Sequence, residues 1–254
     1  MRAERRAALI PYITAGYPTP AASRDALRAA ERAGADFVEV GVPFSDPLAD
    51  GPTIQRSTQT ALDQGMTVAG VLALVREARL AIPVVIMTYV NPVMAFGVER
   101  FVTEAQAAGV SGLLLTDLPA GADPALERRA AGGGLALIRL VAPTTPPGRL
   151  AEAVRGATGF IYLISRLGVT GVREQVPGDL EAQVARVKAA TTLPVAIGFG
   201  IGSAAQAAAA ARVADGVVVG SALVEALGNG GLDSAETLLR ELATAVRAGS
   251  ERRA

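Results

Sequence analysis

Eight short apolar runs, rich in residues that favour strands, alternate with alanine-rich helical stretches along the 254-residue chain. Continuous apolar strands that alternate with helices are typical of a parallel sheet covered on both faces. Eight such units in about 250 residues match the (β/α)₈ barrel, or TIM barrel, of the α/β class. The expected strands are Leu9–Thr14, Phe37–Gly41, Val84–Tyr89, Gly112–Thr116, Leu135–Val141, Phe160–Ile164, Val195–Phe199 and Gly216–Gly220.

The helical stretches between these strands show apolar spacing suited to helices that cover a barrel. The main alternative is an open, doubly wound sheet, which usually has fewer strands and a glycine fingerprint in its first βα turn. That turn reads Gly16-Tyr-Pro-Thr-Pro, so the barrel is favoured. Because no Pro/Ser-rich linker divides the chain, we expect residues 1–254 to form one domain. The expected helices are Ala21–Ala33, Val68–Leu80, Val98–Ala108, Pro124–Ala131, Pro147–Val154, Leu180–Ala190, Ser203–Ala211 and Ser234–Arg247.

The composition argues against nucleic-acid and membrane partners. The formal net charge is zero, and no basic cluster with interleaved aromatic residues occurs. No segment approaches the roughly 20 apolar residues that a membrane-spanning helix needs. The apolar run Ala7–Ile10 is too short for a signal peptide and is followed by Pro11. We therefore expect a cytoplasmic protein.

The residues that the chain lacks restrict its chemistry. There is no histidine and no cysteine. Imidazole and thiolate metal ligands are therefore excluded, as are serine–histidine and cysteine–histidine nucleophiles, and we expect no metal site. The single lysine, Lys188, occupies a polar position of a helical stretch, so we expect it at the surface rather than in a Schiff-base pocket. Acid–base work is left to carboxylates and tyrosines.

An acidic side chain interrupts the second expected strand. Side chains alternate between the faces of a strand, so Val38 and Val40 should face the helices while Glu39 faces the barrel interior. An ionised carboxylate is costly to bury without a partner. Glu39 is therefore either one half of a structural salt bridge to an arginine or a general acid–base residue with a raised pKa, and the second interpretation is favoured.

Other polar residues near strand ends carry less specific signals. The Pro/Gly/Ser-rich loop Pro43–Gly51 contains Asp46 and Asp50, and loop aspartates are usually turn formers or helix caps. Tyr89 and Tyr162 stand at strand ends, where either could be a pocket wall or part of an ordinary aromatic core. Spacing alone does not decide between these interpretations.

Glycines gather after the sixth, seventh and eighth expected strands. Glycine lets a backbone approach an anion closely, and a helix that starts immediately afterwards adds the positive end of its dipole. The loops after strands seven and eight are the standard phosphate site of this fold, although βα turns use glycine in any case. The segments are Leu167-Gly-Val-Thr-Gly, Gly198-Phe-Gly-Ile-Gly-Ser and Val219-Gly-Ser-Ala.

Several motifs resemble those of the tryptophan synthase alpha chain family, in family order and over almost the whole chain. The run from Pro43 to Pro52 is the most specific of them. Tyr12 stands where many members have phenylalanine, and Phe160 where tyrosine is frequent. The matching segments are Pro11-Tyr-Ile-Thr-Ala-Gly-Tyr-Pro, Val40-Gly-Val-Pro-Phe-Ser-Asp-Pro-Leu-Ala-Asp-Gly-Pro, Met87-Thr-Tyr-Val-Asn-Pro, Asp117-Leu-Pro, Val141-Ala-Pro-Thr-Thr-Pro, Tyr162-Leu-Ile-Ser-Arg-Leu-Gly-Val-Thr-Gly and Gly198-Phe-Gly-Ile.

The resemblance implies a reaction and a role for each matching residue. The reaction is the retro-aldol cleavage of indole-3-glycerol phosphate, with Glu39 as the principal acid–base residue and Asp50 holding the indole N–H. Loops 43–52 and 166–177 correspond to lids, with Thr170 contacting Asp50 on closure. The implied substrate-binding residues are Tyr12, Tyr89, Tyr162 and Thr170, and the implied phosphate-binding residues are Gly171, Gly200, Gly220 and Ser221.

The resemblance also implies a partner. Indole would pass to a tryptophan synthase beta chain, which carries pyridoxal phosphate, within an α₂β₂ complex; the alpha chain itself has no cofactor. Two alternatives remain open at this point. One is another phosphate-binding barrel, such as a sugar-phosphate isomerase, although these often use histidine, lysine or cysteine. The other is a weakly active subunit that mainly activates its beta partner.

Overall fold

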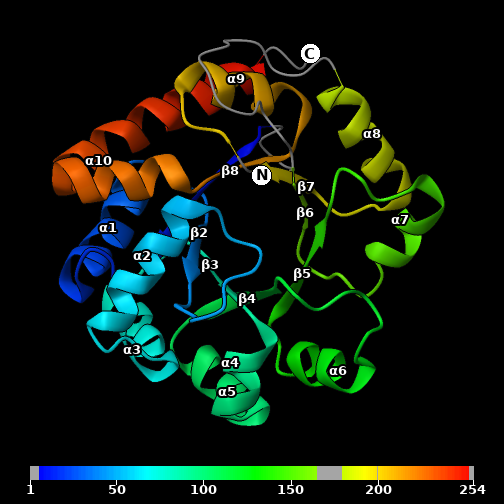
Figure 1. Ribbon diagram of the computed structural model, residues 1–254. Helices are drawn as coiled ribbons and strands as arrows, with labels where there is room; N and C mark the ends of the chain where they lie inside the picture. Colours follow the sequence, from blue (N-terminus) through cyan, green and yellow to red (C-terminus); the bar gives the residue numbers. More distant parts are fainter. Residues whose placement is uncertain (1–5, 165–178, 199, 252–254) are drawn as a thin grey trace.

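Eight parallel strands close into a barrel in sequence order, with β8 paired to β1 (Figure 1). The computed structural model describes residues 6–164, 179–198 and 200–251. The expected barrel is confirmed, and each expected strand is present with ends that agree to within two residues over the described residues. The strands are β1 Ala8–Thr14, β2 Val38–Gly41, β3 Val84–Thr88, β4 Val110–Leu115, β5 Ala136–Val141, β6 Ile161–Ile164, β7 Val195–Gly198 and β8 Gly216–Val219.

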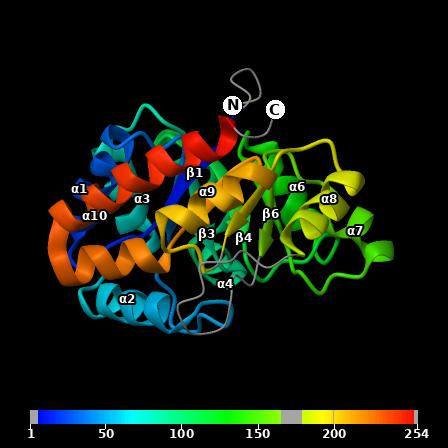
Figure 2. The same ribbon diagram turned by 90° about the horizontal axis from the view of Figure 1, so that it is seen from above.

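Helices form a ring around the strands, as both ribbon views show (Figures 1 and 2). Seven of the expected helices are present, with ends that agree to within two residues. The eighth, Ser234–Arg247, is the second part of a longer helix that is kinked at Gly231. The helices are α1 Pro20–Arg32, α2 Pro52–Asp63, α3 Val68–Ala78, α4 Val90–Phe96, α5 Val98–Ala107, α6 Pro124–Gly132, α7 Pro147–Ala153, α8 Leu180–Ala190, α9 Ala204–Val213 and α10 Ser221–Glu251.

The sequence did not predict α2, α4 or the first turns of α10. The buried face of α2 consists of Ile54, Ser57, Thr58 and Ala61, so only one large apolar side chain marks its inner side. A helix with so small and polar an inner face leaves no clear apolar periodicity in the sequence. Pro52 at its start and the preceding Gly51 are compatible with a helix start but are also typical of turns.

Apolar side chains pack on both faces of the barrel sheet, one set against the helices and the other inside the barrel. Val38 and Val40 belong to the large core between the strands and helices, as the alternation in β2 predicts. Inside the barrel, residues such as Ile10, Leu114 and Ile138 form a separate core. This inner core fills the barrel, so a ligand site can form only at an end of the strands.

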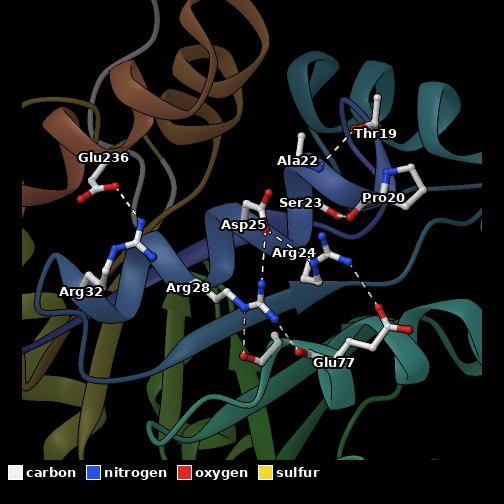
Figure 3. Close-up of polar contacts among 11 residues, drawn as sticks. Thr19, Pro20, Ala22, Ser23, Arg24, Asp25, Arg28, Arg32, Glu77 and Glu236 are labelled. Atoms are coloured by element: carbon white, nitrogen blue, oxygen red, sulfur yellow. Dashed lines mark hydrogen bonds and ion pairs between the residues drawn. The ribbon is translucent and has the colours of Figure 1, made fainter.

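Polar contacts attach α1 to its neighbours on the outside of the barrel (Figure 3). Arg28 donates hydrogen bonds to the carbonyl oxygens of Glu77 (2.8 Å) and Ala78 (3.4 Å) at the end of α3. Arg32 pairs with Glu236 of α10 at 2.9 Å. Exposed ion pairs contribute about 0–1 kcal/mol each, so the apolar core rather than these pairs determines the position of α1.

None of the helices in the described part of the chain combines the length and the apolar character that a membrane span requires.

A close approach of α10 and α9 gives a test of this packing. A Cβ atom added to Gly249 would collide with the backbone of Ala208, whereas one added to Gly148 in α7 would meet open space. We expect Gly249→Ala to lower the free energy of unfolding by about 1–3 kcal/mol. Gly148→Ala should raise it by up to about 1 kcal/mol, because alanine favours the helix. Urea denaturation of both variants measures the difference, and equal effects would contradict the packing.

Candidate active site

A cavity of about 530 Å³ opens where the strands end and the loops that follow them begin. Its volume is within the usual range of small-molecule sites. Side chains from β1, β2, β3, β6 and β8 form one part of its wall, and the loops after β2, β7 and β8 with the starts of α2 and α10 form the rest. The residues proposed from the sequence that line it are Tyr12, Glu39, Asp50, Tyr162, Gly200, Gly220 and Ser221.

Glu39 is buried in the wall of this cavity. It lies in β2 between Tyr12 of β1 and Val85 of β3, and its side chain is 1% exposed. Its Oε1 atom has no hydrogen-bond partner among the described residues. Burial, and secondarily the nearby charge of Asp50, raises the pKa of Glu39 to about 8. The carboxyl group is therefore mostly protonated at neutral pH.

The alternative structural role for Glu39 has no support in the described part of the chain. An ion pair with an arginine would have offset the cost of burial. No such pair involves Glu39 among the described residues, and the nearest titratable groups are themselves acids and phenols. A buried acid without a counter-charge is destabilising for the fold, and such groups gather at functional sites.

Asp50 is held in place by Tyr89. The phenol oxygen of Tyr89 donates a hydrogen bond to Asp50 Oδ2 at 3.0 Å and accepts one from the Ala49 N–H at 3.0 Å. Phe44 packs against the Tyr89 ring, with the ring centroids 5.2 Å apart. Burial raises the pKa of Asp50, and the Tyr89 hydrogen bond opposes this rise. The N-cap of α2 is Gly51, so Asp50 is not its capping residue.

Other residues from the sequence prediction lie away from the cavity. Tyr89 is not among the residues that line it, so its contact there is with Asp50. Asp117 accepts a hydrogen bond from the Val90 N–H at 2.8 Å, at the start of α4. Asp46 accepts one from Ser45 Oγ at 2.6 Å within an exposed turn. This contact is with a neighbouring side chain, so the turn-forming interpretation of Asp46 stays a prediction.

Two tyrosines lean over glycines on neighbouring strands. A Cβ atom on Gly41 of β2 would collide with the Tyr12 phenol, and one on Gly198 of β7 would collide with the Tyr162 phenol. Burial is the main cause that raises the pKa of both phenols, so both stay neutral. The side chains of Tyr12 and Tyr162 thus enter the cavity that Glu39 lines only because those positions lack side chains.

Another part of the cavity wall contains a helix N-terminus. Ser221 is the first residue of α10, and the first N–H groups of a helix have no partner within it. Gly200, with φ +84°, and Gly220 lie in the same wall. The N-terminus of α9 differs, because its Gln206 side chain accepts hydrogen bonds from two backbone N–H groups there. The N-terminus of α10 is therefore the one suited to an anionic ligand.

Three parts of the sequence prediction lie outside the described residues, namely Thr170, Gly171 and the segment 166–177. Within the described residues, no group of histidine, cysteine or acidic side chains has the arrangement of a metal site. Lys188 pairs with Asp215 at 3.0 Å on the outside of the barrel, which confirms its expected place at the surface.

The sequence did not indicate every residue of the site. Ile54 of α2, Met87 and Val218 add apolar surface to the cavity, and Glu225 of α10 adds a carboxylate that accepts a hydrogen bond from Thr53 at 2.7 Å. Apolar strand residues give no signal of their own, because core and pocket residues have the same composition. Ile54 and Thr53 could have been found only by predicting α2.

A closed eightfold barrel with two acids and a helix N-terminus in the wall of one cavity belongs to the class of TIM-barrel enzymes. Comparison with known proteins then identifies the family. The family model for the tryptophan synthase alpha chain matches residues 1–252. The chain belongs to this family.

Individual relatives agree with the family match. The tryptophan synthase alpha chain of Rhizorhabdus wittichii is 47% identical over 237 residues, which cover 92% of this chain and 88% of the relative. That of Chloroflexus aurantiacus is 44% identical over 253 residues, covering 97% and 95%. A solved structure of Mycobacterium tuberculosis tryptophan synthase superposes with a TM-score of 0.89 at 45% identity, covering 97% of this chain and 95% of that one.

Family membership assigns the reaction. Tryptophan synthase alpha chains cleave indole-3-glycerol phosphate to indole and glyceraldehyde 3-phosphate, a lyase reaction of tryptophan biosynthesis. The chain is therefore an enzyme of this type.

The burial of Glu39 predicts a pH-dependent stability. The pKa is about 8 in the folded state and near 4.5 when the group is free, so unfolding between these pH values releases a proton. Glu39 therefore costs stability increasingly as pH rises through this window, by at most about 1.4 kcal/mol per pH unit. Glu39→Gln should become more stable than the parent protein as pH rises from 5 to 8, as measured by urea denaturation. Gly148→Ala changes no titrating group, and its effect should be independent of pH.

Proposed function

We propose that Glu39 moves the protons of the retro-aldol cleavage and Asp50 stabilises the charge that develops on the indole ring, while the N-terminus of α10 binds the phosphate of the substrate. The observation that carries the proposal is the buried, unpaired carboxyl group of Glu39 in the same cavity as Asp50. A retro-aldol cleavage needs only general acid–base catalysis when the leaving carbon can accept the electron pair, as a protonated indole can.

Glu39 can supply and recover one proton within a single turnover. Its protonated carboxyl group, which the raised pKa of about 8 favours, donates a proton to indole C3 and forms an indoleninium-like cation. The resulting carboxylate takes the proton of the hydroxyl group on the adjacent side-chain carbon. As that oxygen becomes the aldehyde oxygen, the carbon–carbon bond breaks and its electron pair restores the aromatic indole. The carboxyl group ends the cycle protonated.

Asp50 has the complementary electrostatic role. A carboxylate that accepts the indole N–H stabilises the positive charge that C3 protonation places on the ring nitrogen. The hydrogen bond from Tyr89 fixes one oxygen of Asp50 and favours its ionised form, which leaves the other oxygen for the substrate. Tyr89 then acts through Asp50, whereas Tyr12 and Tyr162 line the space for the substrate itself.

The phosphate group belongs at the other end of the cavity. The free N–H groups at the start of α10 and the positive end of its dipole favour an anion beside Gly220 and Ser221. Gly200 lets the loop after β7 approach the same point, because its positive φ suits glycine. Thr170 and Gly171 would complete the site.

Substitution of the two acids tests these roles. Glu39→Gln should abolish indole release from indole-3-glycerol phosphate, because the amide can neither give nor take the proton. Asp50→Asn should cost about 3 kcal/mol of transition-state stabilisation, or roughly 150-fold in kcat. Asp46→Asn, in the exposed turn of the same loop, is the matched control. Turnover like that of the parent protein in Glu39→Gln would refute the mechanism.

We propose further that the chain forms an α₂β₂ complex with a tryptophan synthase beta chain in the cytoplasm. Pyridoxal phosphate would be bound by the beta chain, and the alpha chain would work without a cofactor. Leu48 is 93% exposed and Met94 is 53% exposed, in the segments that follow β2 and β3. We propose that these two side chains contact the beta chain.

Indole production with and without an added beta chain tests the partnership. We expect the isolated chain to release indole and the mixture to do so faster, with a particle of α₂β₂ mass in light scattering. A chain that produces no indole alone but accelerates the beta reaction would instead be an activating subunit. Conversion of a ribulose-type phosphate, with no indole release, would favour the isomerase alternative.

A further inference from the structure

Three buried hydroxyl groups form a chain that leads from α2 into the cavity. Ser57 of α2 is 0% exposed, and Thr14 of β1 is 1% exposed. Ser57 Oγ and Thr14 Oγ1 are 2.7 Å apart, and Thr14 Oγ1 lies 3.4 Å from the phenol oxygen of Tyr12. Ser57 Oγ also lies 2.8 Å from the carbonyl oxygen of Ile54. Burying such groups is costly unless their hydrogen bonds are made.

The number of hydroxyl protons limits which hydrogen bonds these three side chains can donate. Each hydroxyl group has one proton to donate. The carbonyl of Ile54 can only accept, so Ser57 donates its proton there. The single proton of Thr14 then serves both Ser57 Oγ at 2.7 Å and the Tyr12 oxygen at 3.4 Å, and Tyr12 is an acceptor in this contact. The Tyr12 oxygen accepts, and its own proton has no acceptor among the described residues.

Packing holds the ring of Tyr12, in addition to the contact between its oxygen and Thr14. The ring packs against Ile54 of α2 and Val224 of α10. A Cβ atom on Gly220 would lie 3.6 Å from the Tyr12 side chain, and Gly41 leaves the space that the phenol group occupies. The phenol oxygen is therefore held at one place in the cavity wall.

Among the described residues, one donor and one acceptor in the cavity are thus left without partners. The donor is the Tyr12 O–H, and the acceptor is the buried Oε1 atom of Glu39, its neighbour on the adjacent strand. A hydroxyl group placed between them would satisfy both, accepting from Tyr12 and donating to Glu39. We infer that Tyr12 donates a hydrogen bond to the substrate hydroxyl oxygen that Glu39 deprotonates, and that Thr14 and Ser57 position it. This inference rests on the proposed function.

The hydrogen bond would strengthen during the reaction. When the hydroxyl proton moves to the Glu39 carboxylate, negative charge develops on the oxygen before the carbon–carbon bond breaks. A fixed donor stabilises that charge, as donors in an oxyanion hole do. Tyr12 keeps its own proton, because burial and the nearby acids disfavour the phenolate. The resemblance to the family indicates phenylalanine at this position in many members, so Tyr12→Phe should fold.

The test is a double-mutant cycle of Tyr12→Phe and Thr14→Val with indole-3-glycerol phosphate. One neutral hydrogen bond predicts a fall in kcat of about threefold to tenfold for Tyr12→Phe, with KM nearly unchanged. Thr14→Val should lose about twofold to fivefold on its own but nothing further in the Tyr12→Phe background. Thr58→Val, a buried hydroxyl on α2 with no hydrogen bond among the described residues, is the control and should keep the parent kcat.

A ligand without side-chain hydroxyl groups separates substrate contact from general damage. Indole-3-propanol phosphate offers Tyr12 no hydroxyl oxygen, so its Kd should be the same for Tyr12→Phe and the parent protein. An unchanged kcat in Tyr12→Phe, or additive losses in the double variant, would overturn the inference. If at the same time Glu39→Gln is inactive, the proposed function stands; if Glu39→Gln turns over normally, the proposed function itself fails.

Discussion

The cavity is built around one carboxyl group that the barrel buries without a counter-charge among the described residues, at a cost in free energy. Glu39 is 1% exposed and has no ion-pair partner among the described residues, so its protonated form is favoured at neutral pH. Every polar neighbour in the cavity wall is consistent with this state: Asp50 adds negative charge, and Tyr12 and Tyr162 stay neutral. The fold loses stability at this point and gains a carboxyl group whose pKa of about 8 lies near neutral pH.

The barrel supplies the geometry that such an acid needs. Strand alternation turns Val38 and Val40 to the helices and Glu39 inward, while the closed sheet fixes its register against Tyr12. The loop after β2 brings Asp50 to the same cavity, and Tyr89 from the neighbouring strand end holds it there. The start of α10 lines the same cavity as the two acids, so one molecule can contact all of them.

The sequence predicts those features that repeat or that are chemically unusual. The eight apolar strands and the inward direction of Glu39 follow from periodicity. The position of the glycines near Gly220 at the end of the barrel follows from the fold. The hydroxyl chain does not follow, because Ser57 belongs to a helix whose inner face is too small and polar to be recognised. The contact between Tyr89 and Asp50 joins residues 39 positions apart and depends on the loop conformation. Such contacts are tertiary, and no local pattern encodes them.

The two tyrosines that lean over glycines have an evolutionary consequence. Gly41 and Gly198 are restricted by a bulky ring on the adjacent strand rather than by their own backbone angles, since neither has a positive φ. A change of Tyr12 to phenylalanine keeps the restriction, because the ring carbon at the tip would also collide with a Cβ atom on Gly41. A change to a small aliphatic residue removes it. Residues 12 and 41, and likewise 162 and 198, should therefore covary across the family, with larger residues at the second position only where the first has lost its ring.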